Sequence, residues 1–202
     1  MARTVVLRAF EDRDIDFIYR CKNDKELNKM IVGLFQPISY EAATQWVHNC
    51  MKGDRPDLKF WAISVNDEEK RIIGWVSLSE IDLKNSSACH HGLVIGDKSY
   101  KDGTAMFEAM LLSMEYAFDK LKVHRLYGSS LSEHKTTPAM MESLGFTIEG
   151  KRRDAFLKNG RFFDLLDYSI LDYEFREHLE KGDYALNSLI KSFIKNIRKS
   201  CI

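Results

Sequence analysis

Paired or clustered cysteines are missing from this sequence, which limits the redox and metal chemistry expected of it. The four cysteines, Cys21, Cys50, Cys89 and Cys201, are scattered along 202 residues and form no CxxC motif or His–Cys spacing. Disulfide frameworks and zinc sites need such groupings. The pattern therefore predicts buried or free thiols and no metal site.

A surplus of charge is missing too, because 30 basic and 30 acidic side chains cancel. A chain without a net field has no general attraction to nucleic acid or to an anionic membrane, although residues 151–153 form a local basic patch. No apolar run approaches the roughly 18 residues of a membrane span. The opening MARTVVLRAF is too short and too charged for a signal peptide. We expect a cytoplasmic protein with no nucleic-acid and no membrane partner.

The composition that remains is that of one folded domain. The 202 residues are 45% hydrophobic and 30% charged, which suffices for one sizeable core and is short for two. Internal repeats and low-complexity segments are absent from the sequence, and only Lys181-Gly182-Asp183 has the character of a linker.

The first half of the chain predicts a strand, two helices and a set of antiparallel strands. Residues 4–8 alternate as a strand does, residues 14–21 follow a helical period, and Ser39 is placed to cap a helix that continues to Cys50. Three further stretches, rich in β-branched and aromatic residues and separated by short polar turns, span residues 59–65, 71–83 and 88–95. Strands joined in this way form an antiparallel meander.

A change of pattern follows the third of these strands. Residues 103–121 have helical spacing and no proline, and residues 125–131 form a strand. A strand, a helix and a second strand in this order predict a parallel pairing across the helix. Pro138 suits the first turn of another helix, and Gly145 is placed to end it.

The remainder of the chain predicts a hairpin and a helical tail. Asn159-Gly160 favours a type I′ turn between two strands, and the sequence becomes helical beyond Asp172. The tail, residues 185–202, has basic residues opposite an apolar stripe of Leu186, Leu189, Ile190, Phe193, Ile194 and Ile197. An isolated helix of this length is marginal in water, so the stripe must pack on its own domain, a second subunit or a membrane interface.

The clearest chemical signal lies between Gly92 and Ala109, which read GLVIGDKSYKDGTAMFEA. An apolar strand passes through a small, flexible turn directly into the long helix. A helix that begins after glycine leaves backbone N–H groups pointing at one spot, with the positive end of the helix dipole behind them. Such a helix start predicts a phosphate or pyrophosphate site.

Together with IGDKSY, LGFTIEG and NGRFFDLLDYSIL, this segment resembles the acyl-CoA-dependent N-acetyltransferases of the GNAT superfamily, in particular the RimJ/RimL-like branch. The resemblance covers residues 3–175. It implies an α/β (α+β) fold: a mixed, mostly antiparallel, twisted sheet of about seven strands with flanking helices, a splayed central strand pair and an extra C-terminal helix. Residues 1–175 would form the acetyltransferase domain and residues 176–202 a helical extension.

The same resemblance implies a site for acetyl-CoA. In this family the pantetheine arm lies between the fourth and fifth strands and pairs with backbone groups of the fourth, here Leu93, Val94 and Ile95. The pyrophosphate would lie on the N–H groups of Lys101, Asp102, Gly103, Thr104, Ala105 and Met106. Counting back from Glu108-Ala109, Lys101 takes the basic place of the family motif, and Thr104 and Met106 take its two small-residue places. A slip of one residue restores Gly103-Thr104-Ala105.

A second difference from the family pattern concerns the group that protonates the leaving thiolate. Relatives often carry Asn after the fifth strand and, seven residues later, a Tyr that protonates the thiolate. Counting back from Gly145-Phe146, these places hold His134 and Met141. A thiol of pKa ~8.5 is a tolerable leaving group, and help from a general acid is worth about 10²–10⁴-fold. The sequence therefore predicts a slow enzyme in which His134 or a water takes the role of the acid.

The incoming amine needs a base, because an alkylamine of pKa ~10.4 is almost fully protonated at neutral pH. Candidates are Glu80 on the third strand, Glu133 after the fifth, and one histidine of the fourth. Neighbouring strand residues point to opposite faces, so only one of His90 and His91 faces the gap, and we take His91. The alternatives are solvated carboxylates and one exposed and one packed histidine.

These interpretations predict an enzyme that moves an acetyl group from acetyl-CoA to a primary amine by direct attack on the thioester. Backbone N–H groups of the fourth strand would stabilise the oxyanion. Protein N-termini, polyamines and amino sugars are all acceptors among similar proteins, and a homodimer is a further expectation. The alternative is a CoA-binding regulatory or scaffold protein with little turnover, suggested by Thr104, Met106 and Met141.

Overall fold

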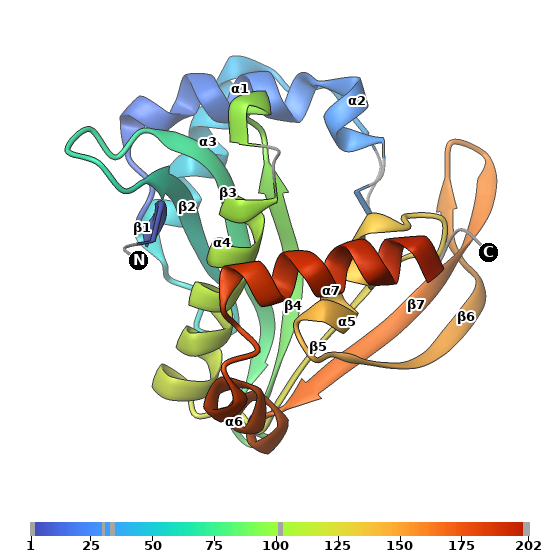
Figure 1. Ribbon diagram of the computed structural model, residues 1–202. Coiled ribbons are helices and arrows are strands. Elements are labelled where there is room, and N and C mark those ends of the chain that lie inside the picture. The colour runs from blue at the N-terminus through green and yellow to red at the C-terminus, as the bar shows by residue number, and fades with distance from the viewer. Residues whose placement is uncertain (1–2, 30, 33–34, 101–102, 200–202) are drawn as a thin grey trace.

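The computed structural model describes residues 3–29, 31–32, 35–100 and 103–199 (Figure 1). Its strands are β1 (Val5–Arg8), β2 (Lys59–Val65), β3 (Ile72–Asp82), β4 (Ser87–Ile95), β5 (Arg125–Leu131), β6 (Thr147–Lys158) and β7 (Arg161–Leu171). Its α-helices are α1 (Ile15–Asn23), α2 (Lys25–Asn28), α3 (Tyr40–Lys52), α4 (Thr104–Glu115), α5 (Thr136–Ser143), α6 (Asp172–Lys181) and α7 (Leu186–Lys199). Short helical turns lie at Asp12–Asp14, Lys98–Tyr100 and Tyr116–Lys120.

The strands form one mixed sheet in the order β1-β2-β3-β4-β5-β7-β6. Every neighbouring pair is antiparallel except β4 and β5, which run parallel on either side of the α4 connection. The mixed sheet of seven strands and the parallel pair that the sequence predicts are therefore confirmed.

Helices cover both faces of the sheet. Residues of α1 and α3, among them Ile18 and Val47, pack with Trp75 and Val94 on one face. On the other face α4 and α5 pack against the central strands in a larger cluster that includes Phe107 and Met141. Figure 1 shows α4, α5 and α7 together on the viewer's side of the sheet. Two cores separated by the sheet hold β4 between them.

Local signals in the sequence set most element boundaries. The Ser39 hydroxyl accepts from the Ala42 N–H at 3.1 Å and caps α3, as expected from the sequence. Asn159 and Gly160 both have positive φ, 52° and 77°, which is the type I′ geometry predicted for the β6–β7 hairpin. Gly145 follows α5 with φ of 86°. The four-residue helix α2 was not predicted, because one turn is too short to show a period.

The tail folds back onto its own domain. Leu189 on α7 is 1% exposed and lies in the same core cluster as Phe107 and Met140. The Phe193 ring meets Phe107 edge to face with centroids 5.6 Å apart, and the Asn196 side chain donates to Ser143 Oγ at 3.1 Å. Of the three surfaces left open by the sequence, the apolar stripe uses the first, and α7 connects α4 to α5.

Membrane-spanning character is not found in the described helices, since none combines the necessary length and apolarity.

Candidate active site

The gap between β4 and β5 is the central feature of the sheet. The two strands pair through three residues each, Ser87–Cys89 with Arg125–Tyr127. Beyond these pairs β4 continues along β3 and β5 continues along β7. Among the strands that the structure describes, none pairs with the β5-facing edge of β4 from Gly92 to Ile95. The predicted splayed pair is present, and its free edge offers backbone donors and acceptors to an extended ligand.

A cavity of about 240 Å³ occupies this gap, which we call the β4–β5 slot. Its walls come from β4, the end of β5, α5, the middle of β7 and the segment after α2. Leu93, Val94 and Ile95 line it, as the sequence predicts, and so do His134 and Met141. Apolar walls with a few polar groups are typical of a binding site for a small molecule.

A β-bulge shapes the β4 wall. The register passes from the pair Ser77–Gly92 directly to Leu78–His90, so His91 is the extra residue on β4. Bulges bend a strand and commonly re-aim side chains beside active sites. His90 is 3% exposed and lines the slot, while the side chain of His91, the histidine chosen from the sequence, lies outside the described part of the structure.

The start of α4 has the backbone features that the sequence predicts for a phosphate site. Gly103 is the N-cap with φ of 92°, and a Cβ at this position would have no neighbour within 4 Å. The first turn of a helix leaves backbone N–H groups without intrahelical acceptors, and open space in front of them suits an anion. Glu108 fixes α4 to β1 by accepting from the Thr4 N–H at 2.7 Å and the Val5 N–H at 3.1 Å.

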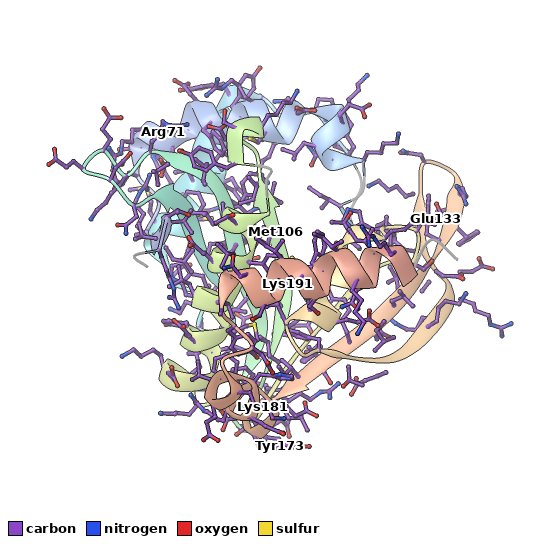
Figure 2. The ribbon with its side chains drawn as sticks, viewed as in Figure 1. Arg71, Met106, Glu133, Tyr173, Lys181 and Lys191 are labelled. Carbon is purple, nitrogen blue, oxygen red and sulfur yellow. The ribbon has the colours of Figure 1, made fainter. Side chains whose placement is uncertain are left out.

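The residues considered for the small-residue motif have different surroundings at the start of α4. Gly103 is the N-cap and Ala105 is 1% exposed, while Met106 packs against the core cluster that includes Phe107 (Figure 2). Which of them take the small-residue places of the family motif stays a prediction. Lys101 and Asp102 lie outside the described residues. Thr104 is the first residue of α4.

Ser130 near the end of β5 shows that the slot fits a polar ligand. Its hydroxyl is buried and has no hydrogen-bond partner among the described residues. A buried hydroxyl without a partner costs free energy, so such a group is expected where a ligand completes its bonding. The Ser130 hydroxyl and the free edge of β4 suit the amide-rich pantetheine arm of acetyl-CoA. The open start of α4 suits its pyrophosphate.

His134 faces the slot just before α5. The Thr137 N–H donates to its Nδ1 at 3.1 Å, and the Thr137 hydroxyl contacts the same nitrogen. Burial lowers the pKa of His134 below its ordinary value. The imidazole is therefore neutral at pH 7 and carries its proton on Nε2, which makes it a hydrogen-bond donor rather than a strong acid.

The two candidate carboxylates have different surroundings. Glu133 forms an ion pair with Arg161 beside the β6–β7 hairpin (Figure 2). Glu80 accepts from the Tyr127 hydroxyl at 2.8 Å and, in the described part of the chain, forms no ion pair. Tyr127 belongs to the last pair before the strands separate, so Glu80 lies on the sheet surface beside the point where the slot begins. Neither carboxylate belongs to the described cavity lining itself.

Glu80 also has an unusual backbone. Its φ is 49°, and it lies in an irregular stretch of β3 between Ser79 and Asp82. A left-handed conformation is uncommon for a residue other than glycine, and strain of this kind gathers at functional sites.

Lys158 helps to hold one wall of the slot, and this role was not predicted from the sequence. It is 4% exposed and ends β6, and its ammonium donates to the carbonyls of Asn28, Lys29 and Ile31 at 3.0, 3.0 and 2.6 Å. Three carbonyls use all three ammonium protons. Leu27, Ile31 and Val32 line the slot, so the hairpin fixes the segment that forms this wall.

Comparison with known proteins shows the family. The family model described as the acetyltransferase (GNAT) domain matches residues 4–147. The chain belongs to the GNAT acetyltransferase family. It is therefore an acetyl-CoA-dependent N-acetyltransferase.

Relatives within the family differ in their named acceptors. The spermidine N(1)-acetyltransferase of Vibrio cholerae is 27% identical over 180 residues, which are 89% of this chain and 100% of that protein. The [ribosomal protein uS5]-alanine N-acetyltransferase of Escherichia coli is 31% identical over 97 residues, 48% of this chain and 50% of that protein. A crystal structure of the Vibrio cholerae spermidine N-acetyltransferase in complex with CoA and spermine has a TM-score of 0.74 at 22% identity, covering 86% of this chain and 98% of that one. The acceptor is thus an amine, and its class is a separate question.

Proposed function

We propose that this N-acetyltransferase acetylates a polyamine, an alkylamine that carries further positive charges. Two considerations support this acceptor over a protein N-terminus or an amino sugar. The spermidine acetyltransferase is matched along its whole length, whereas the ribosomal-protein enzyme is matched along half. In addition, the Glu80 carboxylate, beside the point where β4 and β5 separate, has no cationic partner among the described residues.

Glu80 is the residue on which the proposal depends. Other carboxylates on this part of the sheet are neutralised, Asp167 by Arg152 at 2.7 Å and Glu149 by Arg125 at 2.5 Å. Leu126 packs in the α4 core, so Tyr127 and the Glu80 carboxylate bound to it point to the opposite face. There Glu80 is placed to attract an ammonium group and to accept the proton that the amine must lose before it attacks.

The cofactor half of the proposal assigns the backbone edge of Leu93, Val94 and Ile95 to the pantetheine arm and the first turn of α4, from Gly103 to Met106, to the pyrophosphate. Ser130 and the Nε2–H of His134 would donate hydrogen bonds inside the slot. Residues 1–175 would carry all of these groups, with residues 176–202 as the helical extension, and a homodimer remains part of the proposal.

A thiol-release assay with acetyl-CoA and a panel of amines tests the acceptor class. We expect spermidine and spermine to be acetylated with a higher kcat/KM than an alanine-ended peptide or glucosamine. Glu80→Gln should lower kcat/KM for spermidine by about 10²-fold, the lower range for loss of a general base. Glu149→Gln, on the same face, should leave it unchanged. A parent enzyme that acetylates the peptide alone would overturn the polyamine proposal.

The Lys158 contact gives a second expectation. Lys158→Met removes the ammonium that holds Asn28, Lys29 and Ile31 and leaves their three carbonyls without this donor, so the acceptor wall of the slot should loosen. We expect the KM for spermidine to rise about tenfold, the equivalent of one charge-assisted hydrogen bond of roughly 1.5 kcal/mol, while the thermal shift produced by acetyl-CoA persists.

Lys151→Met is the matched control for this change. Lys151 is also on β6, but its pair with Asp164, at 3.0 Å, is exposed and expected to contribute little. Equal KM values for the parent and Lys158→Met would show that the hairpin contact does not position the acceptor wall.

A further inference from the structure

Tyr168 on β7 enters the slot from the side opposite β4. It pairs with Gly128 on β5 and is 3% exposed. A Cβ at Gly128 would lie 2.9 Å from Tyr168 Cε2 and 3.0 Å from the His90 carbonyl oxygen. The ring therefore lies over Gly128, in space that any larger residue at this position of β5 would fill. It is close to the point where β4 and β5 begin to separate.

The hydroxyl of Tyr168 is available to a ligand. It makes no hydrogen bond to any residue that the structure describes, although the side chain lines the slot and its ring packs edge to face on Phe146 at 5.8 Å. Burial raises the pKa of Tyr168 above its ordinary value, so the phenol stays protonated throughout the pH range in which an amine acceptor reacts.

From this arrangement we propose that Tyr168 is the general acid that protonates the departing sulfur of acetyl-CoA. Met141 lines the same slot and has no proton to give. This assignment rests on the acetyl transfer stated above. The family pattern would place the acidic tyrosine at residue 141, whereas we assign the role to residue 168.

The other groups around the slot are poorer proton donors. His134 is neutral, with Nδ1 bonded to Thr137, so it offers a hydrogen bond and no acidic proton. Cys89 lies on β4 between the buried Ala88 and His90, so its thiol faces away from the core side. Ser130 has a hydroxyl far less acidic than a phenol. The Tyr127 hydroxyl already donates to Glu80. Tyr168 is the phenol among the described side chains that line the slot.

The step balances as follows. The lone pair of the neutral amine forms a C–N bond with the thioester carbonyl carbon, and the C–S bond breaks with its electron pair on sulfur. Sulfur takes the phenolic proton of Tyr168 and leaves as the thiol of CoA. The proton released from the new amide nitrogen returns to the phenolate through solvent, so the enzyme ends as it began.

Kinetics test the proposal first. Tyr168→Phe keeps the ring and removes the proton, and we expect kcat to fall by about 10²-fold, with little change in KM for acetyl-CoA. In the Tyr168→Phe background, Met141→Tyr should restore much of the lost rate, because it returns a phenol to the slot. Tyr173→Phe, at an exposed tyrosine on α6 (Figure 2), is the matched control. A Tyr168→Phe enzyme with the parent kcat would overturn the assignment.

Product binding tests the proposal without turnover. A phenol that donates to sulfur favours the CoA thiolate, so the affinity of the parent for CoA should rise relative to desulfo-CoA between pH 7 and pH 9.5, through the thiol pKa of ~8.5. Both ligands meet the same protein groups, so the ratio of the two affinities cancels the titration of His90 and His134 in the slot lining and of Cys89 and Asp167 near Tyr168. In Tyr168→Phe the ratio should stay flat. A parent ratio that is itself flat would contradict the proposal, whether or not a polyamine is the acceptor.

Discussion

Gly103→Val is expected to abolish the stabilisation of this protein by acetyl-CoA. At 100 times its Kd a ligand adds about 2.7 kcal/mol to the free energy of unfolding. For a domain of this size that is a rise in Tm of roughly 5–10 °C. Valine disfavours the φ of 92° that starts α4, and its side chain would occupy the open space in front of the helix N–H groups. Both effects remove the pyrophosphate site while the core beneath α4 stays intact.

Gly53→Val is the control that distinguishes loss of the pyrophosphate site from the backbone strain of placing valine at a positive φ. Gly53 has φ of 58° and, like Gly103, no neighbour within 4 Å of an added Cβ, but it ends α3 away from the slot. It should lower the Tm of the free protein and keep the full shift with acetyl-CoA, measured by differential scanning fluorimetry. If Gly103→Val keeps the shift as well, the pyrophosphate does not lie at the start of α4.

Leu189→Ala is expected to cost about 2–5 kcal/mol of stability, because it opens a cavity where α7 meets the main core. Leu189 is 1% exposed and shares its cluster with Phe107, Met140 and Leu144. In a domain of about 200 residues a loss of this size lowers Tm by roughly 4–20 °C. Urea unfolding of the free protein measures it directly.

Ile194→Ala on the same helix provides the comparison. Ile194 is 46% exposed, so its truncation should change stability by less than about 0.5 kcal/mol. Both variants should keep the oligomeric mass of the parent. A change of mass in Ile194→Ala alone would mean that the outer edge of α7 contacts a second subunit, and a stable Leu189→Ala would show that α7 contributes little to the core.

Local signals account for the part of the fold that the sequence could predict. The cap of Ser39, the turn at Asn159-Gly160 and the strand–helix–strand order around α4 each depend on residues close together in the chain. The register of the glycine motif was harder, because counting from the middle of a helix does not locate its first residue. The backbone conformation of Gly103 does.

Contacts between distant residues account for the features that were missed. Lys158 and Asn28 are 130 positions apart, and nothing in the Leu157-Lys158-Asn159 stretch distinguishes a buried lysine from an exposed one. Tyr168 has the alternation of an ordinary core tyrosine on β7. Its value as an acid depends on Gly128 of the neighbouring strand and on the separation of β4 from β5. Met141, at the place where family members often have tyrosine, was visible in the sequence. The residue that we propose as the acid instead, Tyr168, was not.

The position of α7 across α4 and α5 has a consequence for biosynthesis. Synthesis begins at the N-terminus, and domains generally fold as units. All seven strands and the helices around the slot precede Leu186, so a nascent chain contains its sheet before it contains the helix that covers Phe107 and connects α4 to α5. Until α7 is synthesised, Phe107 and the side of α5 around Ser143 lack this cover. We therefore expect the core on this face of the sheet to close only when the last helix has been made.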